Sequence, residues 1–542
     1  MEKANATAWW KNTIGYQIYI KSFADSNDDG IGDICGITSK LDYIKNLGVK
    51  FIWVCPFYDS PMDDNGYDVR DYLKIDKIYG KMTDLKKLIS EAHNRDIKVV
   101  IDLVMNHTSD ECAWFVKSEK KIEPYTDMYV WRDGKMVEGK MCPPNNWVSF
   151  FSGSAWKYSE KRKQYFLKIF SNKMPDINYE SEVAFNEMEK VIDYYGSIGV
   201  DGFRVDAIAH LGKDLTFNDA KNLKKTYKSF SNLPNNHKYI KRFNKYFTRN
   251  NLVTMGELGG DPTTKDIMKY TTEKELDMIF SFEQMGVFNN KNHTINSKGL
   301  LKTLKYKTSI SDKNGWSVLF WLNHDYPRLI SKIRGELDPK NAQISLATLM
   351  YMLKGTPIIY NGEEIGMENY PFKSPADFKD VNAKMIFENA KDDAEIEREF
   401  NKLKETSRDH SRTVMQWDNT KNAGFSTAKP WTYVNSDYKS VNVEKSIKDK
   451  KSILNNYIAI NKLRLAIGEH LIDAKYKFYN KKGLVGYKAT NGNTVIEVVA
   501  NLSKRNQTIK LPEDAQHLYS NMPCAGSLNR YQVVVVSYSN NN

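Results

Sequence analysis

Cysteine is scarce in this chain, which has only five cysteines in 542 residues and no CxxC pair. This scarcity excludes a disulfide-dense scaffold and gives no indication of a cysteine-based zinc site. No run of eighteen apolar residues occurs, so no membrane partner is expected. The first twenty residues lack a basic stretch followed by a long apolar core, and so do not resemble a signal peptide. We therefore expect a cytoplasmic protein.

A dense block of one charge is also absent. The formal net charge is +12, but the lysines are scattered among acidic and polar residues. We interpret this charge as a solvated surface and expect no nucleic-acid partner. Hydrophobic residues make up 41% of the chain, as in ordinary globular proteins, and its length allows more than one domain.

Short apolar runs rich in β-branched and aromatic residues recur along the chain. Segments with helical periodicity, such as 38–48 and 83–96, separate most of them. Alternating strands and helices predict parallel strands joined by crossovers, and continuous hydrophobicity predicts burial on both faces. The runs number eight, as in a (β/α)8 TIM barrel. They are 16–23, 51–57, 99–107, 202–209, 252–258, 277–284, 316–325 and 356–366.

Two connections are too long to be simple loops. The first follows the third strand, and its Trp, Pro and Gly residues predict a small inserted domain at 108–172. The second is a charged, loop-rich excursion at about 367–440. Short alternating runs near the end predict a C-terminal antiparallel β-sandwich. We expect the barrel to comprise 1–107 and 173–468, and the C-terminal all-β domain to comprise 469–542.

Charged and polar residues stand where the predicted strands end. In a barrel, functional residues gather at the C-terminal ends of the strands, so these side chains would share one mouth. Glycoside cleavage needs a carboxylate beneath the anomeric carbon and a carboxylic acid beside the leaving oxygen. The alternative is a buried ion pair that only fills the barrel. The residues are Asn106, His107, Arg204, Asp206, Glu257, His324 and Asp325.

Four segments resemble the signature segments of the α-amylase superfamily of glycoside hydrolases: DLVMNH (102–107), GFRVDAIA (202–209), GEL (256–258) and FWLNHDYPR (320–328). SRDHSRTVMQWD (407–418) further resembles the α-glucosidase and oligo-1,6-glucosidase branch. The resemblance implies a retaining, exo-acting α-glucosidase that releases terminal glucose from short α-glucosides. It implies no organic cofactor and a monomer or homodimer.

The resemblance also implies roles for individual residues. Asp206 matches the nucleophile, Glu257 the general acid/base, and Asp325 the third carboxylate, which steadies the transition state. Asp64, with Arg408 as its partner, would grip the outer hydroxyls of the terminal glucose and so turn the site into a pocket. The residues implied to bind or orient the sugar are Asp64, Tyr67, His107, Phe151, Phe170, Arg204, His324 and Arg408.

Departures from the branch concern the linkage and the leaving group. Met174 replaces a usual glutamine, and Tyr326 replaces another. In this branch a valine at the position of Ala207 tends to accompany α-1,6 cleavage, and a smaller residue tends to accompany α-1,4 cleavage. The resemblance therefore leads us to expect α-1,4 cleavage. An oligo-1,6-glucosidase, a trehalose-6-phosphate hydrolase and a sugar isomerase or transglucosidase are the alternatives. A non-catalytic relative is disfavoured because all three carboxylates are present.

The run DSNDDGIGD at 25–33 is rich in oxygen donors and follows the first strand. An EF-hand is excluded because its twelfth position would be Gly36 rather than glutamate. The resemblance implies one structural Ca²⁺ here, although magnesium or a metal-free turn rich in Asx residues is the alternative. The implied ligands are Asp25, Asn27, Asp29, Asp33 and the backbone carbonyl of Ile31.

Overall fold

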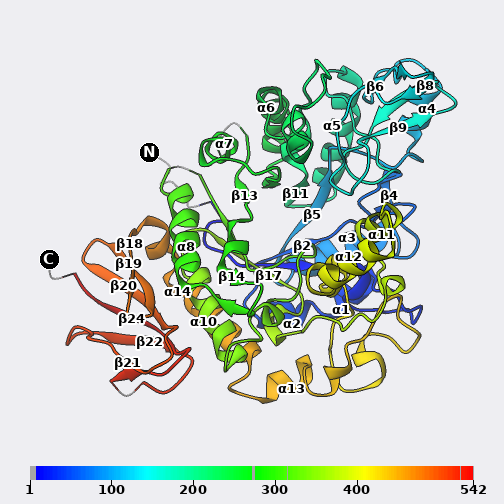
Figure 1. Cartoon of the computed structure of the whole chain (residues 1–542). Helices are drawn as coiled ribbons and strands as arrows, with labels where there is room; N and C mark the ends of the chain where they lie inside the picture. The colour runs from blue at the N-terminus through cyan, green and yellow to red at the C-terminus, as the bar shows by residue number, and fades with distance from the viewer. Residues whose placement is uncertain (1–7, 272–274, 314, 525, 541–542) are drawn as a thin grey trace.

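The computed structural model of the chain describes residues 8–271, 275–313, 315–524 and 526–540. Eight parallel strands form one sheet in the order β13-β12-β11-β5-β2-β1-β17-β16 (Figure 1). A single parallel bridge between Ile279 and Ser317 joins the two outer strands, which confirms the predicted barrel. The strands are β1 (Gly15–Ile18), β2 (Phe51–Val54), β5 (Lys98–Val104), β11 (Gly202–Asp206), β12 (Val253–Glu257), β13 (Met278–Phe280), β16 (Val318–Leu319) and β17 (Thr356–Tyr360).

The observed strands are shorter than the apolar runs that predict them. The run 316–325, for example, contributes only the two-residue strand β16. His324 and Asp325 therefore lie in the loop beyond the strand, at its C-terminal end. The same shortening leaves His107 beyond β5. The polar ends of these runs therefore belong to the mouth of the barrel rather than to its wall.

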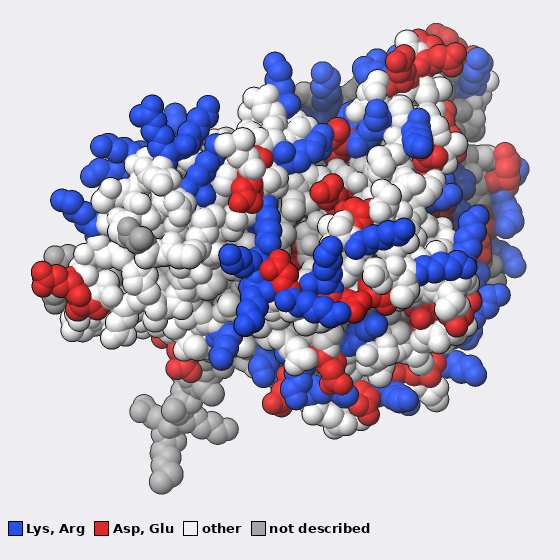
Figure 2. All heavy atoms as spheres, turned by 90° about the horizontal axis from the view of Figure 1, so that it is seen from below, with Lys and Arg blue, Asp and Glu red and all other residues white. Residues whose placement is uncertain are grey.

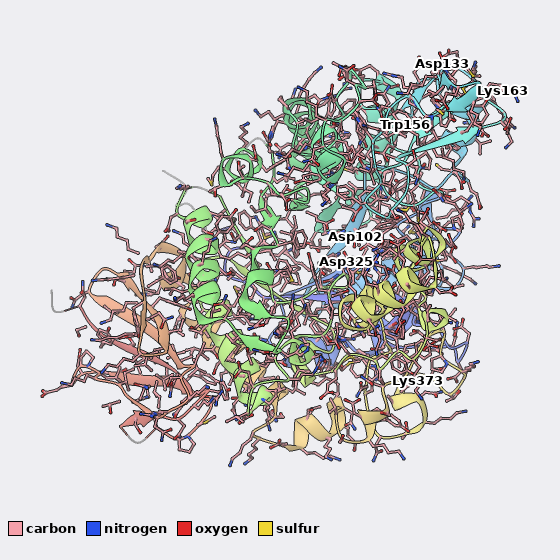
Figure 3. The ribbon with its side chains drawn as sticks, in the orientation of Figure 1. Asp102, Asp133, Trp156, Lys163, Asp325 and Lys373 are labelled. Atoms are coloured by element: carbon pink, nitrogen blue, oxygen red, sulfur yellow. The ribbon has the colours of Figure 1, made fainter. Side chains whose placement is uncertain are left out.

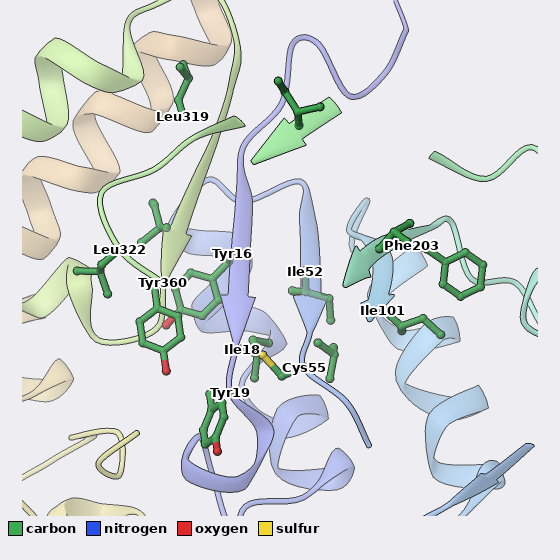
Figure 4. Packing of buried hydrophobic residues seen from close by; sticks show 14 of the residues in the cluster. Tyr16, Ile18, Tyr19, Ile52, Cys55, Ile101, Phe203, Leu319, Leu322 and Tyr360 are labelled. Carbon is green, nitrogen blue, oxygen red and sulfur yellow. The ribbon is translucent and has the colours of Figure 1, made fainter. Parts of the chain in front are cut away.

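Helices cover the outside of the barrel. In α3 the buried residues Leu85, Leu88, Ile89 and Ala92 repeat at helical spacing and form one apolar face. Ile52, Ile101 and Phe203 occupy outward-facing positions of their strands, on the side that the helices cover (Figure 4). The longer helices are α3 (Met82–His93), α5 (Glu182–Ser197), α6 (Pro234–Arg249), α8 (Ser297–Ser311), α10 (Pro339–Tyr351) and α14 (Ile453–Asp473).

Large side chains fill the interior of the barrel. One cluster of buried residues brings together Phe51 and Trp53 with Met255, Phe280 and Phe320, all from inward positions of the strands. Gly15 of β1 leaves room for them, because a Cβ there would lie 2.2 Å from the Phe51 ring. The interior is therefore a packed core with its polar residues at one end.

The segment after β5 folds around a small sheet in the order β6-β10-β9 and a separate hairpin, β7–β8. Figure 3 places Asp133, Trp156 and Lys163 in this segment, at the edge of the molecule. Its elements are α4 (Ala113–Glu119), β6 (Trp131–Arg132), β7 (Lys135–Val137), β8 (Lys140–Cys142), β9 (Trp156–Ser159) and β10 (Gln164–Leu167). The precise domain boundaries given above remain predictions.

The C-terminal residues form a five-stranded antiparallel sheet and a two-stranded sheet of β21 (Gln507–Thr508) and β23 (Ser527–Leu528). The sheet packs against α10, where the Ser345 hydroxyl donates to the Tyr531 carbonyl over 2.7 Å. The antiparallel C-terminal region is thus confirmed. The strands of the larger sheet are β18 (Lys475–Lys481), β19 (Leu484–Asn491), β20 (Thr494–Asn501), β24 (Val533–Ser539) and β22 (Gln516–Ser520).

The excursion after β17 contains α11 (Val381–Glu388) and α12 (Asp393–Thr406) and then short helical turns. On one face of the molecule, Lys and Arg are largely interspersed with Asp and Glu (Figure 2). Within the described ranges, no helix combines the length and apolar character needed to cross a bilayer.

Candidate active site

A cavity of about 270 Å³ opens at the C-terminal ends of the barrel strands. All three predicted catalytic carboxylates line it, and so do all the predicted sugar-binding residues except Arg204. The cavity therefore collects residues from the segments after β2, β5 and β16, from the ends of β11 and β12, from the inserted segment and from the excursion. The lining residues are Asp64, Tyr67, His107, Phe150, Phe151, Phe170, Met174, Asp206, Ala207, His210, Glu257, Gly259, Gly260, His324, Asp325 and Arg408.

Arg204 lies at the base of this cavity and is almost fully buried. Its Nη1 donates to Asp206 Oδ1 over 2.6 Å, and its Nη2 donates to Glu257 Oε2 over 2.7 Å. Arg204 and Asp206 point to the same side of β11 because they are two residues apart on one strand. One planar guanidinium thus orients both carboxylates toward the cavity.

A third carboxylate, Asp102, bonds to the same guanidinium over 2.7 Å. Asp102 lies directly opposite Arg204 on the neighbouring strand β5. The Trp53 indole donates to its other oxygen over 2.8 Å, and the Tyr67 hydroxyl donates there over 3.3 Å. Figure 3 labels Asp102 and Asp325 in the central part of the molecule. Asp102 has no exposed surface, so we assign it to holding Arg204 in place.

Burial and the Arg204 guanidinium act in opposite directions on the carboxyl groups of this cluster. Burial raises the pKa of Asp206 well above its usual range, although the Arg204 guanidinium opposes that rise. Burial likewise raises the pKa of Asp102, to about 6, again against Arg204. Arg204 therefore favours the ionised form of Asp206, which is the form that its predicted role as nucleophile needs.

Asp325 has the opposite electrostatic environment. Burial opposes its ionisation, but His324 at 3.3 Å and the guanidinium groups of Arg408 and Arg412 hold the pKa of Asp325 well below its usual range. Arg408 lies 3.2 Å from Asp325 Oδ1, and Arg412 lies 3.1 Å from the same oxygen. Asp325 is therefore a fixed anion at the cavity wall.

The far wall of the cavity is an ion pair between Asp64 and Arg408. Arg408 Nη2 donates to Asp64 Oδ1 over 2.9 Å and also donates to Asp380. Arg412 Nη1 lies 3.4 Å from the same Asp380 oxygen. Three carboxylates and two guanidinium groups thus form one buried network, in which each charge has opposite charges as neighbours.

Three histidines line the cavity, and burial keeps each of them in its neutral form. Burial lowers the pKa of His107 to about 3 and that of His324 to about 3. His107 Nε2 is buried at the cavity and has no hydrogen-bond partner in the described part of the chain. The His324 ring stacks on Tyr67 with a centroid distance of 5.2 Å, and its Nδ1 lies 2.9 Å from Gln17 Nε2. The free nitrogen of the neutral His107 imidazole suits a sugar hydroxyl, which can both donate and accept a hydrogen bond.

Aromatic rings from the inserted segment close the cavity from above. Phe170 lies 5.2 Å from the His107 ring and 5.5 Å from Phe151. The Arg408 guanidinium sits 5.0 Å from the Phe151 centroid. Phe150 and His210, whose ring centroids are 5.0 Å apart, extend this wall.

A buried lysine fastens the inserted segment to the barrel. Lys213 Nζ lies 2.8 Å from Asp176 Oδ2 and donates to Asn106 Oδ1 over 2.8 Å. Asp176 follows the inserted segment, whereas Asn106 follows β5. The ammonium group therefore fixes the two sides of the cavity relative to each other.

The loop at 25–33 is a compact turn held by its own carboxylates. Asp25 accepts hydrogen bonds from three backbone amides, including that of Gly30 over 2.8 Å. Asp29 accepts from the amide of Ile31, and Asp33 accepts from Ser26. Within the described residues, no three or more His, Cys, Asp or Glu side chains are grouped in a way that could hold a metal ion. Hydrogen bonds of this kind are typical of a turn rich in Asx residues, and calcium binding here remains a prediction.

Sequence patterns alone do not single out several of these residues. The sequence could have indicated a role for Asp102, because it is a charged residue at an inward position of a strand. No sequence pattern indicates one for Asp380, Arg412, Phe150 or His210. Phe150 and His210 line the cavity, whereas Asp380 and Arg412 lie behind its wall. All four stand in loops or short helical turns, where spacing does not predict direction.

Comparison with known proteins agrees with this geometry. The model of the α-amylase catalytic domain matches residues 17–472. Oligo-1,6-glucosidase of Bacillus cereus is 40% identical over 531 residues, 94% of this chain and 93% of that protein.

Two solved structures cover 98% of this chain and 100% of their own. They are trehalose-6-phosphate hydrolase of Bacillus licheniformis, 35% identical with a TM-score of 0.88, and trehalulose synthase of Pseudomonas mesoacidophila, 33% identical with a TM-score of 0.90. This chain belongs to the α-amylase family of glycoside hydrolases.

Proposed function

We propose that this enzyme is a retaining, exo-acting α-glucosidase that hydrolyses terminal α-linked glucose from short oligosaccharides. The observation that carries the proposal is the bridge that Arg204 makes between Asp206 and Glu257 at the base of the cavity. Retaining enzymes place their two carboxyl groups roughly 5–5.5 Å apart, and inverting enzymes roughly 6.5–9.5 Å. Two carboxylates bound to one guanidinium support the shorter separation.

The reaction proceeds by double displacement. A carboxylate oxygen of Asp206 forms a bond to the anomeric carbon while the glycosidic bond breaks, and Glu257 gives its proton to the leaving oxygen. Glu257 then takes a proton from water, whose oxygen attacks the same carbon and frees Asp206. Asp325 stays ionised throughout and balances the positive charge that develops on the sugar ring.

The exo mode of action rests on the wall formed by Asp64 and Arg408. This ion pair lines the cavity and contacts Asp325 through Arg408, so we expect it to close the site behind the terminal glucose and to leave no room there for a further sugar. Asp64 Oδ2 and the neutral histidines are positioned to bind the outer hydroxyls of that terminal glucose.

For the linkage we propose a preference for α-1,4 over α-1,6 bonds, because the small side chain of Ala207 lines the cavity beside Glu257. The second candidate is α-1,6 cleavage, which the name of the Bacillus cereus relative favours. We also propose that the loop at 25–33 binds one structural Ca²⁺. The cytoplasmic location, the monomeric or dimeric state and the lack of a nucleic-acid partner remain predictions.

A substrate panel tests the function. Glucose release is measured from p-nitrophenyl α-glucoside, maltose, isomaltose and trehalose, and NMR follows the anomer first released. We expect α-glucose as the first product and maltose as the better disaccharide. First release of β-glucose would exclude retention, and no hydrolysis of any of these compounds would exclude an α-glucosidase.

A further inference from the structure

A second cavity of about 530 Å³ adjoins the sugar cavity on the side of Glu257. The two cavities share Glu257, Gly259, Gly260 and Asp325 as lining residues. A group that leaves from the anomeric carbon toward Glu257 must enter this second space. It is therefore the space that receives the aglycone, the part of the substrate beyond the cleaved bond.

The charge of this aglycone cavity is negative. Asp261 and Glu283 line it in addition to the two shared carboxylates, and none of its described lining residues is lysine or arginine. Phe282 and Tyr326 add an aromatic surface, with ring centroids 5.6 Å apart. Aromatic faces suit the apolar face of a sugar ring, and carboxylates accept hydrogen bonds from its hydroxyls.

Glu283 is held in place from behind by Lys307 of helix α8. Lys307 Nζ lies 2.9 Å from Glu283 Oε1 and donates to the Ser281 carbonyl over 2.8 Å. The lysine side chain has no exposed surface, whereas 22% of the Glu283 side chain is exposed. Lys307 therefore cannot reach a ligand, and it fixes one Glu283 oxygen.

The other oxygen, Glu283 Oε2, has no hydrogen-bond partner in the part of the chain that the structure describes. Asp261, at the rim, accepts from the Tyr227 hydroxyl over 2.9 Å. A phosphate group on the aglycone would carry about −1.5 to −2 charges at neutral pH. It would meet these carboxylates without a cation to balance it.

We propose that this cavity selects uncharged sugar aglycones and rejects phosphorylated ones, with Glu283 as an acceptor for aglycone hydroxyls and Lys307 as its positioning residue. This inference rests on the proposed α-glucosidase activity. It separates this enzyme from a phosphosugar hydrolase, although one structural relative is named as such.

The test compares substrate pairs that differ only in a phosphate: trehalose with trehalose 6-phosphate, and maltose with maltose phosphorylated on its reducing-end glucose. We expect kcat/KM to fall at least about tenfold on phosphorylation, because like charges placed together disfavour a partner strongly. Equal or faster hydrolysis of the phosphorylated member would overturn the inference. Hydrolysis of p-nitrophenyl α-glucoside reports on the proposed function separately.

Two variants test the residues. Glu283→Gln should lower the ratio of kcat/KM for maltose to that for p-nitrophenyl α-glucoside by about tenfold, because the aglycone hydroxyl would lose a charged acceptor and keep at most a neutral one. Asp261→Asn lies at the exposed rim and should raise the relative rate on trehalose 6-phosphate. Glu397→Gln, on the exposed face of α12, is the matched control. Unchanged ratios in both cavity variants, with melting curves like the wild type, would overturn the assignment.

Discussion

Arg408 donates from Nη2 to Asp64 Oδ1 over 2.9 Å, although 344 positions separate the two residues. Arg408→Met should leave Asp64, Asp325 and Asp380 with one guanidinium fewer. We expect kcat/KM for p-nitrophenyl α-glucoside to fall about 100-fold, because each hydrogen bond to a charged group contributes about 1.5–3 kcal/mol. Arg398→Met, on exposed α12, is the control, and equal activities in both variants would contradict the proposed pocket wall.

The two catalytic carboxylates should respond differently to the leaving group. Glu257→Gln should lose about 10²–10⁴-fold in kcat on maltose, which needs a proton on its leaving oxygen, but much less on p-nitrophenyl α-glucoside. Asp206→Asn should lose activity on both substrates because the bond to the anomeric carbon cannot form. Steady-state kinetics on both substrates distinguishes these roles, and the opposite pattern would exchange them.

Ala207 controls the proposed linkage preference. Ala207→Val should raise the ratio of kcat/KM for isomaltose over that for maltose, because the added methyl groups narrow the cavity beside Glu257. The residue has a φ of 47°, a left-handed conformation that disfavours β-branched side chains. We therefore also expect a lower melting temperature. An unchanged isomaltose-to-maltose ratio would show that linkage is set elsewhere.

The buried carboxyl group of Glu363 gives stability a pH dependence. Burial raises its pKa from a usual value near 4.5 to about 8, against hydrogen bonds from the Tyr351 and Tyr457 hydroxyls. A group with a raised pKa in the folded state contributes stability that is fully present below pH 4.5 and is lost as the pH rises toward 8.

Glu363→Gln should therefore flatten the fall in unfolding free energy between about pH 4.5 and 8. Urea unfolding of the wild type and the variant at several pH values in this window measures the difference. Parallel curves for the two proteins would show that Glu363 keeps its usual pKa in the fold.

Calcium should stabilise the enzyme through the loop at 25–33. A ligand that binds only the folded state at 100 times its Kd adds about 2.7 kcal/mol. We expect Ca²⁺ to raise Tm relative to EDTA in the wild type and not in Asp29→Asn. Asp393→Asn is the control at an exposed position, and a Ca²⁺ response in the Asp29 variant equal to that of the wild type would place the metal elsewhere.

Much of the barrel and of its mouth could be predicted, because β-branched runs with polar ends have few alternatives in a parallel sheet. Arg204 and Asp206 share one face by strand alternation alone, and the structure places both as that rule requires. The strand limits were less predictable. The run 316–325 leaves the sheet before its end, since the side chains of His324 and Asp325 turn into the cavity.

The network around Arg408 was only partly predictable. The sequence resemblance paired Arg408 with Asp64, but Asp380 and Arg412 stand in an irregular excursion with no periodic signal. Lys213 was likewise missed, because a lone lysine after a strand looks like a solvated residue. Its burial depends on two oxygens contributed by distant segments, Asn106 and Asp176.

The packed interior of the barrel also constrains the path by which water reaches the active site. Phe51, Trp53, Met255, Phe280 and Phe320 pack against one another in the described interior of the barrel. Water for deglycosylation is therefore expected from the side of Glu257 on which both cavities lie. The aglycone leaves on this same side, so it has to depart before water can hydrolyse the glycosyl-enzyme. An aglycone that stays bound is itself a nucleophile that competes with water.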